Sequence, residues 1–175
     1  MSEVMDAIKA RRCVRKFTSE PVAEDAVERI MEAGLWAPSG MNKQTAVVVA
    51  ITDPEVCDRL RKANAAVAGM SEDADPFYGA PVVLVALART DFPTYVYDGS
   101  LMMGNMLLAA HDEGLGACWI HRAKEEFQMP EWQEWLHSLG LEGEYEGIGH
   151  VALGHYEGDY PTGAPRNDGR AVWVR

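Results

Sequence analysis

The chain has 175 residues, with 16 Lys and Arg against 27 Asp and Glu, so its formal net charge at pH 7 is −11. This length suits one domain with its own core, and the acidic balance argues against binding to nucleic acid or to an anionic membrane surface, both of which need a basic face. The first residues, MSEVMDAIKARR, lack the apolar core of a signal peptide, and no later run is apolar enough to cross a bilayer, so we expect a cytoplasmic protein.

The chain begins with two stretches of helical spacing. Residues 2–12 predict a helix with Ser2 as N-cap and an apolar face that contains Val4, Met5 and Ile8. Pro21 precedes a second helix over 22–36, which Pro38 prevents from continuing.

Two apolar runs then predict strands on either side of a third helix. The run TAVVVAIT (45–52) is rich in β-branched residues and predicts a strand buried on both faces. A helix over 53–69 follows, with Asp53 as N-cap and Pro54 at its first position. The run APVVLVALAR (80–89) predicts a second buried strand.

A long apolar segment follows over 93–113 and ends at Gly114. Its apolar residues cover most of the circumference of a helix, which is typical of a helix buried on several sides. The pattern fits a helix against a partner subunit and the central helix of a monomer about equally well.

The last third of the chain predicts three shorter elements and a tail. They are a strand over 115–120, an amphipathic helix over 130–140 and a strong strand over 145–156. The tail from 157 reads as a loop that becomes strand-like at AVWV, residues 171–174. Helices that interleave with strands in this order indicate an α+β or α/β sandwich around a central sheet.

Few residues match the patterns of the common catalytic or metal centres. His111, His121, His137, His150 and His155 form no i, i+4 pair and no HExxH pattern, so we expect each on the surface or in packing. There is no GxSxG elbow and no phosphate-binding GxxxxGK[ST] loop, and GLGACW has only two glycines of a dinucleotide fingerprint. The three cysteines form no CxxC motif, which argues against a disulfide framework or a zinc site.

The segment KARRCVRK, residues 9–16, places five cations within eight positions of this acidic chain. Cations at a helix C-terminus suit the helix dipole, which explains any one of them, while a group of them indicates a site for an anion. Cys13 stands between arginines that favour its thiolate, so a thiol role is one interpretation and a small polar residue beside an anion is the simpler one.

The segment APSGMNKQ, residues 37–44, leads directly into the first predicted strand. Asn42 and Gln44 are two residues apart, so their amides point the same way and offer donors and acceptors to the edge of a flat heterocycle. An ordinary loop between a helix and a strand is the alternative.

Five segments in this order resemble the nitroreductase family of FMN-dependent oxidoreductases, in particular its short bacterial members. They are RRCVRKF, GLWAPSGMNKQ, PFYGAPVVLV, DGSLMMGNMLLAAHDEGLGACWI and GIGHVALGHYEGDYPTGAPRNDGR. The resemblance runs from about Val4 to Arg170. Each segment is weak alone, but the five together are specific.

The resemblance implies a set of FMN-binding residues. The phosphate would meet Arg11, Arg12 and Cys13, joined by Arg166 and Arg170 from the far end of the chain, and Arg15 would lie near the pyrimidine end of the flavin. A second subunit would contribute Pro38, Ser39, Gly40, Asn42 and Gln44. The main chain of Trp119, Ile120 and His121 would lie against the isoalloxazine ring.

The chain departs from the family pattern in three places. Cys13 stands where serine is usual and offers the phosphate a weaker donor. Thr45 and Ala46 replace a common Pro-Trp pair, and His150 occurs where Gly-Tyr is common.

The resemblance implies an α+β fold with a central, mostly antiparallel sheet flanked by helices, in an intertwined homodimer with FMN sites at the interface. Residues 1–175 would form one domain, whose C-terminal arm over about 157–175 wraps the partner subunit. NADH or NADPH would reduce the flavin and a nitroaromatic compound, a quinone or a similar small molecule would reoxidise it, with no side chain as an essential acid or base. Enoate reduction, dehalogenation and non-catalytic FMN binding are the alternatives.

Overall fold

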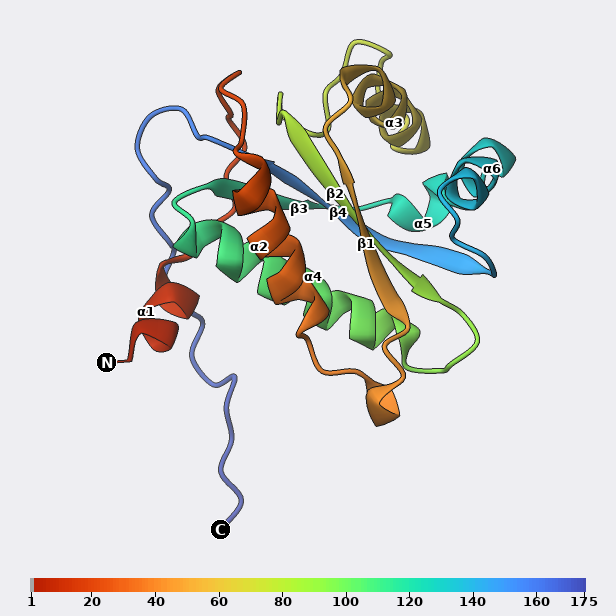
Figure 1. Ribbon diagram of the computed structural model, residues 1–175. Helices are drawn as coiled ribbons and strands as arrows, with labels where there is room; N and C mark the ends of the chain where they lie inside the picture. Colours follow the sequence, from red (N-terminus) through yellow and green to blue (C-terminus); the bar gives the residue numbers. More distant parts are fainter. Residues whose placement is uncertain (1) are drawn as a thin grey trace.

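A computed structural model describes residues 2–175 as a four-stranded sheet between two layers of helices (Figure 1). The strands are β1 (Ala46–Ile51), β2 (Val82–Arg89), β3 (Gly116–Ile120) and β4 (Tyr145–Gly154). The helices are α1 (Glu3–Ala10), α2 (Glu24–Leu35), α3 (Pro54–Val67), α4 (Tyr95–Asp112), α5 (Ala123–Glu126) and α6 (Pro130–Ser138), with the short 3₁₀ turn η1 (Gly40–Asn42). None of these described helices is both long and apolar enough to span a membrane.

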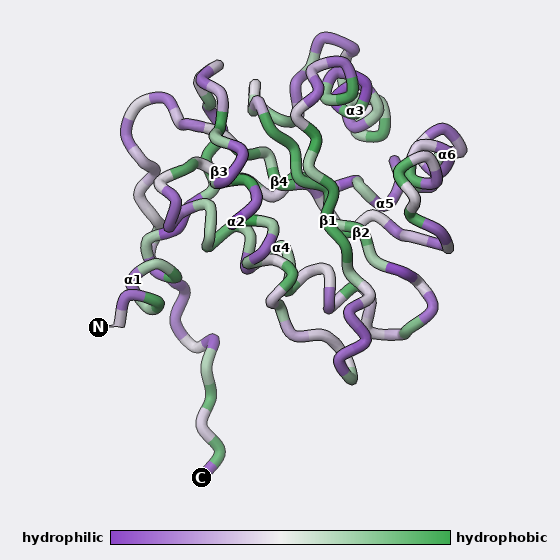
Figure 2. The backbone as a smooth tube through the Cα atoms, in the orientation of Figure 1, coloured by the Kyte–Doolittle hydropathy of each residue, from purple (hydrophilic) through white to green (hydrophobic). Residues whose placement is uncertain are grey.

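The sheet has the order β1-β2-β4-β3, and every neighbouring pair is antiparallel. Helices α2 and α4 cover one face, while α3, α5 and α6 cover the other (Figure 1). Because β2 lies in the middle, all its residues except Arg89 are buried, and the strands form the most hydrophobic part of the chain (Figure 2). The expected α+β architecture with an antiparallel sheet is confirmed.

The predicted helices are all present, as are the four predicted strands before the tail, with shifted ends. Asp53 caps α3 as expected, because its carboxylate accepts hydrogen bonds from the backbone N–H groups of Glu55 and Val56. Ser2 occupies the N-cap position of α1, but its side chain makes no capping bond. Helix α2 starts at Glu24 instead of residue 22, since the residues after Pro21 are still extended. The four-residue α5 was not predicted.

Two strand predictions need correction. The strand β1 is not buried on both faces, because it lies at the edge of the sheet and only Ile51 is fully buried. The tail residues 171–174 form no strand within the chain; they extend away from the body past α1 (Figure 1), and Val172, Trp173 and Val174 are at least 80% exposed.

Helix α4 is the central core helix that one interpretation of its pattern predicted. Met102, Met103 and Met106 are buried against the sheet and α2, which makes α4 the main helix of this core. Tyr97 and Leu101, on its other side, are 70% and 48% exposed. Apolar surface therefore remains after the core of one chain is filled.

A buried acid–base pair joins α5 to β4. Glu126 and His150 are both fully buried, and Glu126 Oε2 lies 2.8 Å from His150 Nε2. The imidazole also contacts the edges and faces of Phe77 and Phe127. His150 is thus the packing histidine that the sequence allowed, with a partner that the sequence did not indicate.

We expect that removing one member of this pair lowers the free energy of unfolding strongly, and that replacing both members with apolar residues lowers it far less. Glu126→Ala leaves His150 buried without its partner and should lower the free energy of unfolding by about 3–5 kcal/mol, whereas Glu126→Leu with His150→Phe should cost far less. Urea unfolding at fixed protein concentration measures both. Lys124→Ala, which breaks the exposed 2.9 Å pair with Glu146, is the control and should cost under about 1 kcal/mol. A loss of similar size for Lys124→Ala and Glu126→Ala would contradict the prediction.

Candidate functional site

The cationic segment lies along the two last strands of the sheet. Cys13 forms a parallel backbone bridge with Ala117 in β3, and Phe17 forms an antiparallel bridge with Tyr156 just beyond β4. Val14 between them is buried, with its backbone N–H donating to the Ala117 carbonyl at 3.0 Å. Because side chains alternate along an extended chain, Cys13 and Arg15 project from the face opposite Val14.

Arg12 is held away from that face. Its guanidinium Nη1 donates to the carbonyls of Lys9 and Arg11 at 2.6 Å each, at the end of α1. The Tyr160 hydroxyl accepts a bond from the Arg12 backbone N–H at 2.9 Å and donates to its carbonyl at 3.2 Å. In this structure Arg12 therefore ties α1 to the C-terminal segment, which is the helix-end role that the sequence also allowed.

Arg11, Cys13 and Arg15 come together with Cys118 of β3. Arg11 Nη1 lies 3.9 Å from the Cys13 sulfur, and the buried Cys118 thiol donates to the Trp119 carbonyl at 3.7 Å. The neighbouring Cys118 thiol, with the bond and charge of Arg11, lowers the pKa of Cys13 to about 5. The neighbouring Cys13 and burial raise the pKa of Cys118.

A cleft of about 310 Å³ opens beside this group. Its walls are the loop after α3 and the end of β3, and its lining residues are Met70, Ala74, Asp75, Pro76, Tyr78, Trp119, Ile120, His121 and Arg122. Tyr78 connects the cleft to the cations, because its hydroxyl is hydrogen-bonded to the Arg15 side chain. The expected residues Trp119, Ile120 and His121 thus line one cleft, with Arg15 at its edge.

The buried Asn64 of α3 fixes the backbone at one end of the cleft. Its Nδ2 donates to the His121 carbonyl at 2.9 Å, and its Oδ1 accepts from Arg122 Nε and Nη2 at 3.0 and 2.8 Å. Arg122 has a left-handed backbone with φ of 80°. Sequence reasoning missed Asn64; the only available signal was a polar residue within the apolar face of a predicted helix.

A second buried polar residue, Asp98 of α4, fixes the loop over 37–44. Its carboxylate accepts from the Gly40 backbone N–H at 3.0 Å and from the hydroxyls of Thr45 and Thr94 at 3.0 and 3.3 Å. This also gives a role to Thr45, one of the departures from the family pattern. The sequence did not single out Asp98.

The amides of Asn42 and Gln44 lie together, as their spacing predicts. Gln44 Nε2 donates to Asn42 Oδ1 at 3.2 Å, and both side chains are exposed. Pro38, Ser39 and Gln44 line a small cleft of about 180 Å³ against α2 and α4. The loop therefore presents amides outward instead of contacting its own core.

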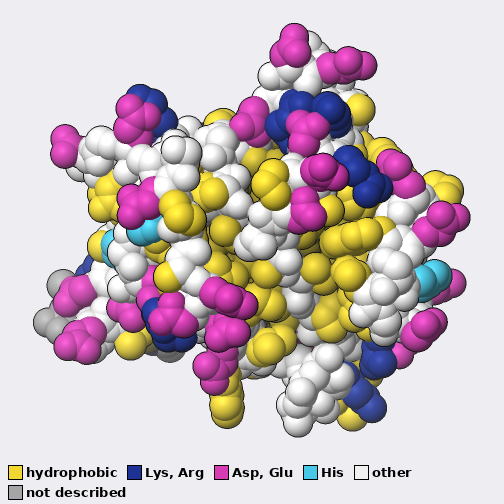
Figure 3. Space-filling model, turned by 45° about the horizontal axis from the view of Figure 1, so that its top comes forward, with side chains coloured by type: hydrophobic (Ala, Val, Ile, Leu, Met, Phe, Trp, Pro, Cys, Tyr) yellow, Lys and Arg dark blue, Asp and Glu magenta, His cyan; other side chains and the backbone are white. Residues whose placement is uncertain are grey.

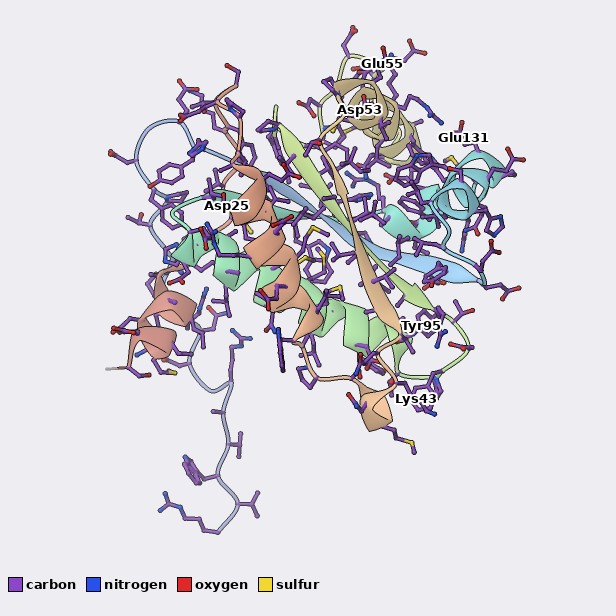
Figure 4. All side chains as sticks on the ribbon, in the orientation of Figure 1. Asp25, Lys43, Asp53, Glu55, Tyr95 and Glu131 are labelled. Carbon is purple, nitrogen blue, oxygen red and sulfur yellow. The ribbon has the colours of Figure 1, made fainter. Side chains whose placement is uncertain are left out.

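The loop over 37–44 leads into β1 at one edge of the sheet, whereas the cleft beside Trp119 is lined by the end of β3, the strand at the other edge. Figure 4 shows Lys43 of this loop near Tyr95 at one end of β1, and Asp53 and Glu55 of α3 at the other. The linings of the two clefts share no residue. The resemblance assigns the loop over 37–44 and the residues from Trp119 to His121 to one flavin, but within a single chain these two groups line different clefts.

The two remaining expected phosphate ligands lie in the extended tail. Arg166 and Arg170 are exposed and follow the segment that Tyr160 anchors. The structure does bring Arg11 and Arg15 together, and their guanidinium groups could bind an anion. They lie next to the cleft whose walls include Trp119 and main-chain groups. Among residues 2–175, no group of three or more His, Cys, Asp or Glu side chains is placed to hold a metal ion.

Comparison with known proteins places this arrangement in a family. The sequence profile of the nitroreductase family matches residues 8–155. A relative from Methanothermobacter thermautotrophicus, described as a putative NADH dehydrogenase/NAD(P)H nitroreductase, is 28% identical over 121 residues; the match covers 67% of this chain and 60% of the relative.

Two solved structures align with this chain over the full length of both proteins. A nitroreductase with bound FMN from Bacteroides fragilis has a TM-score of 0.88 and 29% identity, with 100% of each chain covered. A nitroreductase with bound FMN from Desulfitobacterium hafniense has a TM-score of 0.87 and 25% identity, again with 100% of each chain covered. With the family profile matched from the cationic segment to the end of β4, the chain belongs to the nitroreductase family.

Proposed function

We propose that the protein is an FMN-dependent oxidoreductase that takes electrons from NADH or NADPH and passes them to an oxidised small molecule, such as a nitroaromatic compound or a quinone. The observation that carries this proposal is the pair of cations, Arg11 and Arg15, beside the cleft of Trp119 in a nitroreductase-family chain. The FMN bound in two structural relatives supports the choice of cofactor.

The residues present suit FMN. Arg11 offers charge-assisted bonds to a phosphate dianion, and the cleft wall from Trp119 to His121 offers backbone N–H groups to a flat ring. The thiolate of Cys13 would repel the phosphate, so FMN binding favours its protonated form. Arg166 and Arg170 lie in the exposed C-terminal tail, so they could contact the phosphate only after the tail moved toward it.

A bound flavin supplies hydride transfer, and the protein supplies orientation and charge. Arg15 places positive charge at the edge of the cleft, where it stabilises an electron-rich ring. Asn64 holds the His121 carbonyl and the Arg122 side chain, so the wall of the cleft keeps its shape when reactants enter and leave. No side chain is assigned as an acid or base, and donor and acceptor would occupy the same face in turn.

The flavin site would be completed by a second copy of the chain. The loop over 37–44 presents exposed amides and shares no lining residue with the cleft beside Trp119, and β1 leaves one edge of the described sheet unpaired. Val4 and Ile8 of α1 are 67% and 46% exposed, and α1 buries no residue. Hydrophobic side chains also gather in the middle of one face of the molecule (Figure 3). A homodimer whose C-terminal arms cross to the partner would cover such surfaces.

The function is tested with the purified protein. We expect a yellow protein with about one FMN per chain, which NADH or NADPH bleaches without oxygen and a quinone restores, because the cofactor carries the electrons. Visible absorbance during anaerobic titration is the measurement. A flavin that neither nicotinamide bleaches would indicate a non-catalytic FMN-binding protein, and a colourless chain that takes up no FMN would contradict the whole proposal.

Two variants separate the phosphate site from the ring site. Arg11→Ala removes a charge-assisted contact, so FMN should bind about tenfold to a hundredfold more weakly, roughly 1.5–3 kcal/mol, with riboflavin little affected because it has no phosphate. Asn64→Ala loosens the wall of the cleft and should weaken both ligands by the same factor. Fluorescence titration of each flavin measures the four affinities.

Lys16→Ala is the control for charge alone. Lys16 belongs to the same cationic segment but pairs with Glu157 at 3.0 Å on the surface, so its loss should leave the ratio of FMN to riboflavin affinity unchanged. Equal losses of FMN and riboflavin affinity in Arg11→Ala would mean that this arginine is only structural.

We expect the dimer to be inseparable from the fold. Obligate interfaces bury more than about 2,000 Å² and leave no stable monomer, so the urea midpoint should rise with protein concentration. A mixture of Arg11→Ala and Asn42→Ala chains gives the sharper test. If each site draws on both chains, a mixed dimer carries both lesions in one site and leaves the other intact, so activity should recover above that of either parent.

The complementation experiment requires that both parents are inactive and exchange subunits. Arg11→Ala mixed with Asn64→Ala is its control, because each mixed dimer then has one lesion in each site and activity should not recover. A monomeric mass together with bound FMN and full activity would overturn the shared site.

A further inference from the structure

Tyr160, in the segment that follows β4, binds the backbone of the cationic segment at Arg12. Its hydroxyl accepts a hydrogen bond from the Arg12 N–H at 2.9 Å and donates one to the Arg12 carbonyl at 3.2 Å. A phenol can accept and donate at the same time, so one side chain pairs both backbone groups of a residue 148 positions away. The oxidoreductase function described above assigns no role to this tyrosine.

Arg12 stands between Arg11 and Cys13, which the resemblance places at the phosphate. Helix α1 holds the backbone before Arg12, because the Arg11 N–H donates to a carbonyl of that helix at 2.9 Å. Strand β3 holds the backbone after it through the Val14 N–H, at 3.0 Å. Tyr160 binds the residue between these two points. The course of the backbone from Arg11 to Cys13 is therefore determined by bonds to three separate parts of the chain.

The ring of Tyr160 is itself packed from two sides. Its centroid lies 5.3 Å from that of Tyr156, at an interplanar angle of 70°, and 5.0 Å from that of His111 near the end of α4. Tyr160 is half-buried, whereas every residue from 161 to 175 is exposed. Packing against two rings leaves the hydroxyl few alternative positions, so it is held against the backbone of Arg12.

The side chain of Arg12 stabilises the same corner of the fold. Its guanidinium donates to the carbonyls of Lys9 and Arg11 at the end of α1. A Cβ added at Gly163 would overlap this guanidinium, so the chain beyond Tyr160 passes directly over Arg12. Arg12 thus contributes to the cationic segment through the course of its backbone, while its side chain holds α1.

We propose that Tyr160 is a positioning residue for FMN, which acts through the backbone of Arg12 to hold Arg11 and Cys13 toward the phosphate. The inference rests on the proposed function and adds a residue to it. Arg11 Nη1 already lies 3.9 Å from the Cys13 sulfur, so both side chains reach the same point. Donors held in place before the ligand arrives lose less entropy on binding, which raises affinity. In this role Tyr160 touches neither the phosphate nor the flavin ring.

The test compares Tyr160→Phe with the unchanged full-length protein in fluorescence titrations of FMN and riboflavin. The variant keeps the packed ring and loses the two bonds to Arg12, so FMN should bind about threefold to thirtyfold more weakly, the range for one or two neutral hydrogen bonds. Riboflavin has no phosphate, and its affinity should change less than about twofold. Tyr156→Phe is the matched control, since it removes a hydroxyl from the neighbouring ring and leaves the bonds to Arg12 in place.

A double variant distinguishes positioning from independent damage. Tyr160 acts through the residues that it holds, so Tyr160→Phe should weaken FMN far less once Arg11→Ala has removed the phosphate contact. The combined loss should therefore stay clearly below the product of the two single losses. Two independent structural effects would multiply.

Amide hydrogen exchange reports on the same backbone before FMN is added. Tyr160→Phe should speed exchange of the Arg12 N–H about tenfold, because its acceptor is lost, and should leave the Val14 N–H on β3 unchanged. Faster exchange at both amides would mean that the whole segment leaves the sheet and that Tyr160 is only structural.

Three results would overturn the inference: equal weakening of FMN and riboflavin in Tyr160→Phe, single losses that multiply in the double variant, or unchanged exchange at Arg12. The failure of the proposed function looks different. If FMN binds, NADH bleaches it and Tyr160→Phe keeps the full FMN affinity, the inference about Tyr160 is wrong and the oxidoreductase function stands. A chain that takes up no FMN contradicts both.

Discussion

Two backbone bridges place the cationic segment on the sheet, and the arrangement of the site follows from them. The bridges from Cys13 to Ala117 and from Phe17 to Tyr156 hold together a segment whose like charges repel one another. Gly116 permits the approach, because a Cβ there would lie 2.9 Å from Val14 Cγ1. With Val14 locked inward, alternation along the chain turns Cys13 and Arg15 to the same side. Burial of one apolar residue thus fixes the direction of a charged and a nucleophilic one.

The loops of the site are held by polar groups buried in the helices. Arg122 beside the cleft and Asn42 and Gln44 in the other loop all have left-handed backbones, which cost roughly 1–2 kcal/mol per residue. Asn64 fixes the turn at Arg122, and Asp98 fixes the loop over 37–44. Such strain persists only where the surroundings determine the backbone. In both loops, a buried side chain of a helix therefore determines the course of the backbone.

The sequence predicted the elements well because each has a local cause: Asp53 and Pro54 start α3, and β-branched runs form β1 and β2. It also predicted that Asn42 and Gln44 project together. It could not predict that β1 lies at a sheet edge, since burial depends on which strands pair. Asn64 and Asp98 were missed because their partners stand 57 and 53–58 residues away. The direction of Arg12 depends on Tyr160, a contact across 148 residues.

Three of the positions that depart from the family pattern, Cys13, Thr45 and His150, have a side-chain neighbour elsewhere in the chain. Thr45 donates to Asp98, which proline could not do, and the bond holds the loop over 37–44. His150 lies against the carboxylate of Glu126, and the neighbouring thiol of Cys118 lowers the pKa of Cys13. Removing either member of a buried polar pair leaves the polar group of the other without a partner. Substitution of one member alone therefore lowers stability, whereas substitution of both together need not. Each of these departures therefore adds a side-chain contact without changing the fold. Of the three contacts, only the one at Cys13 lies beside the cleft.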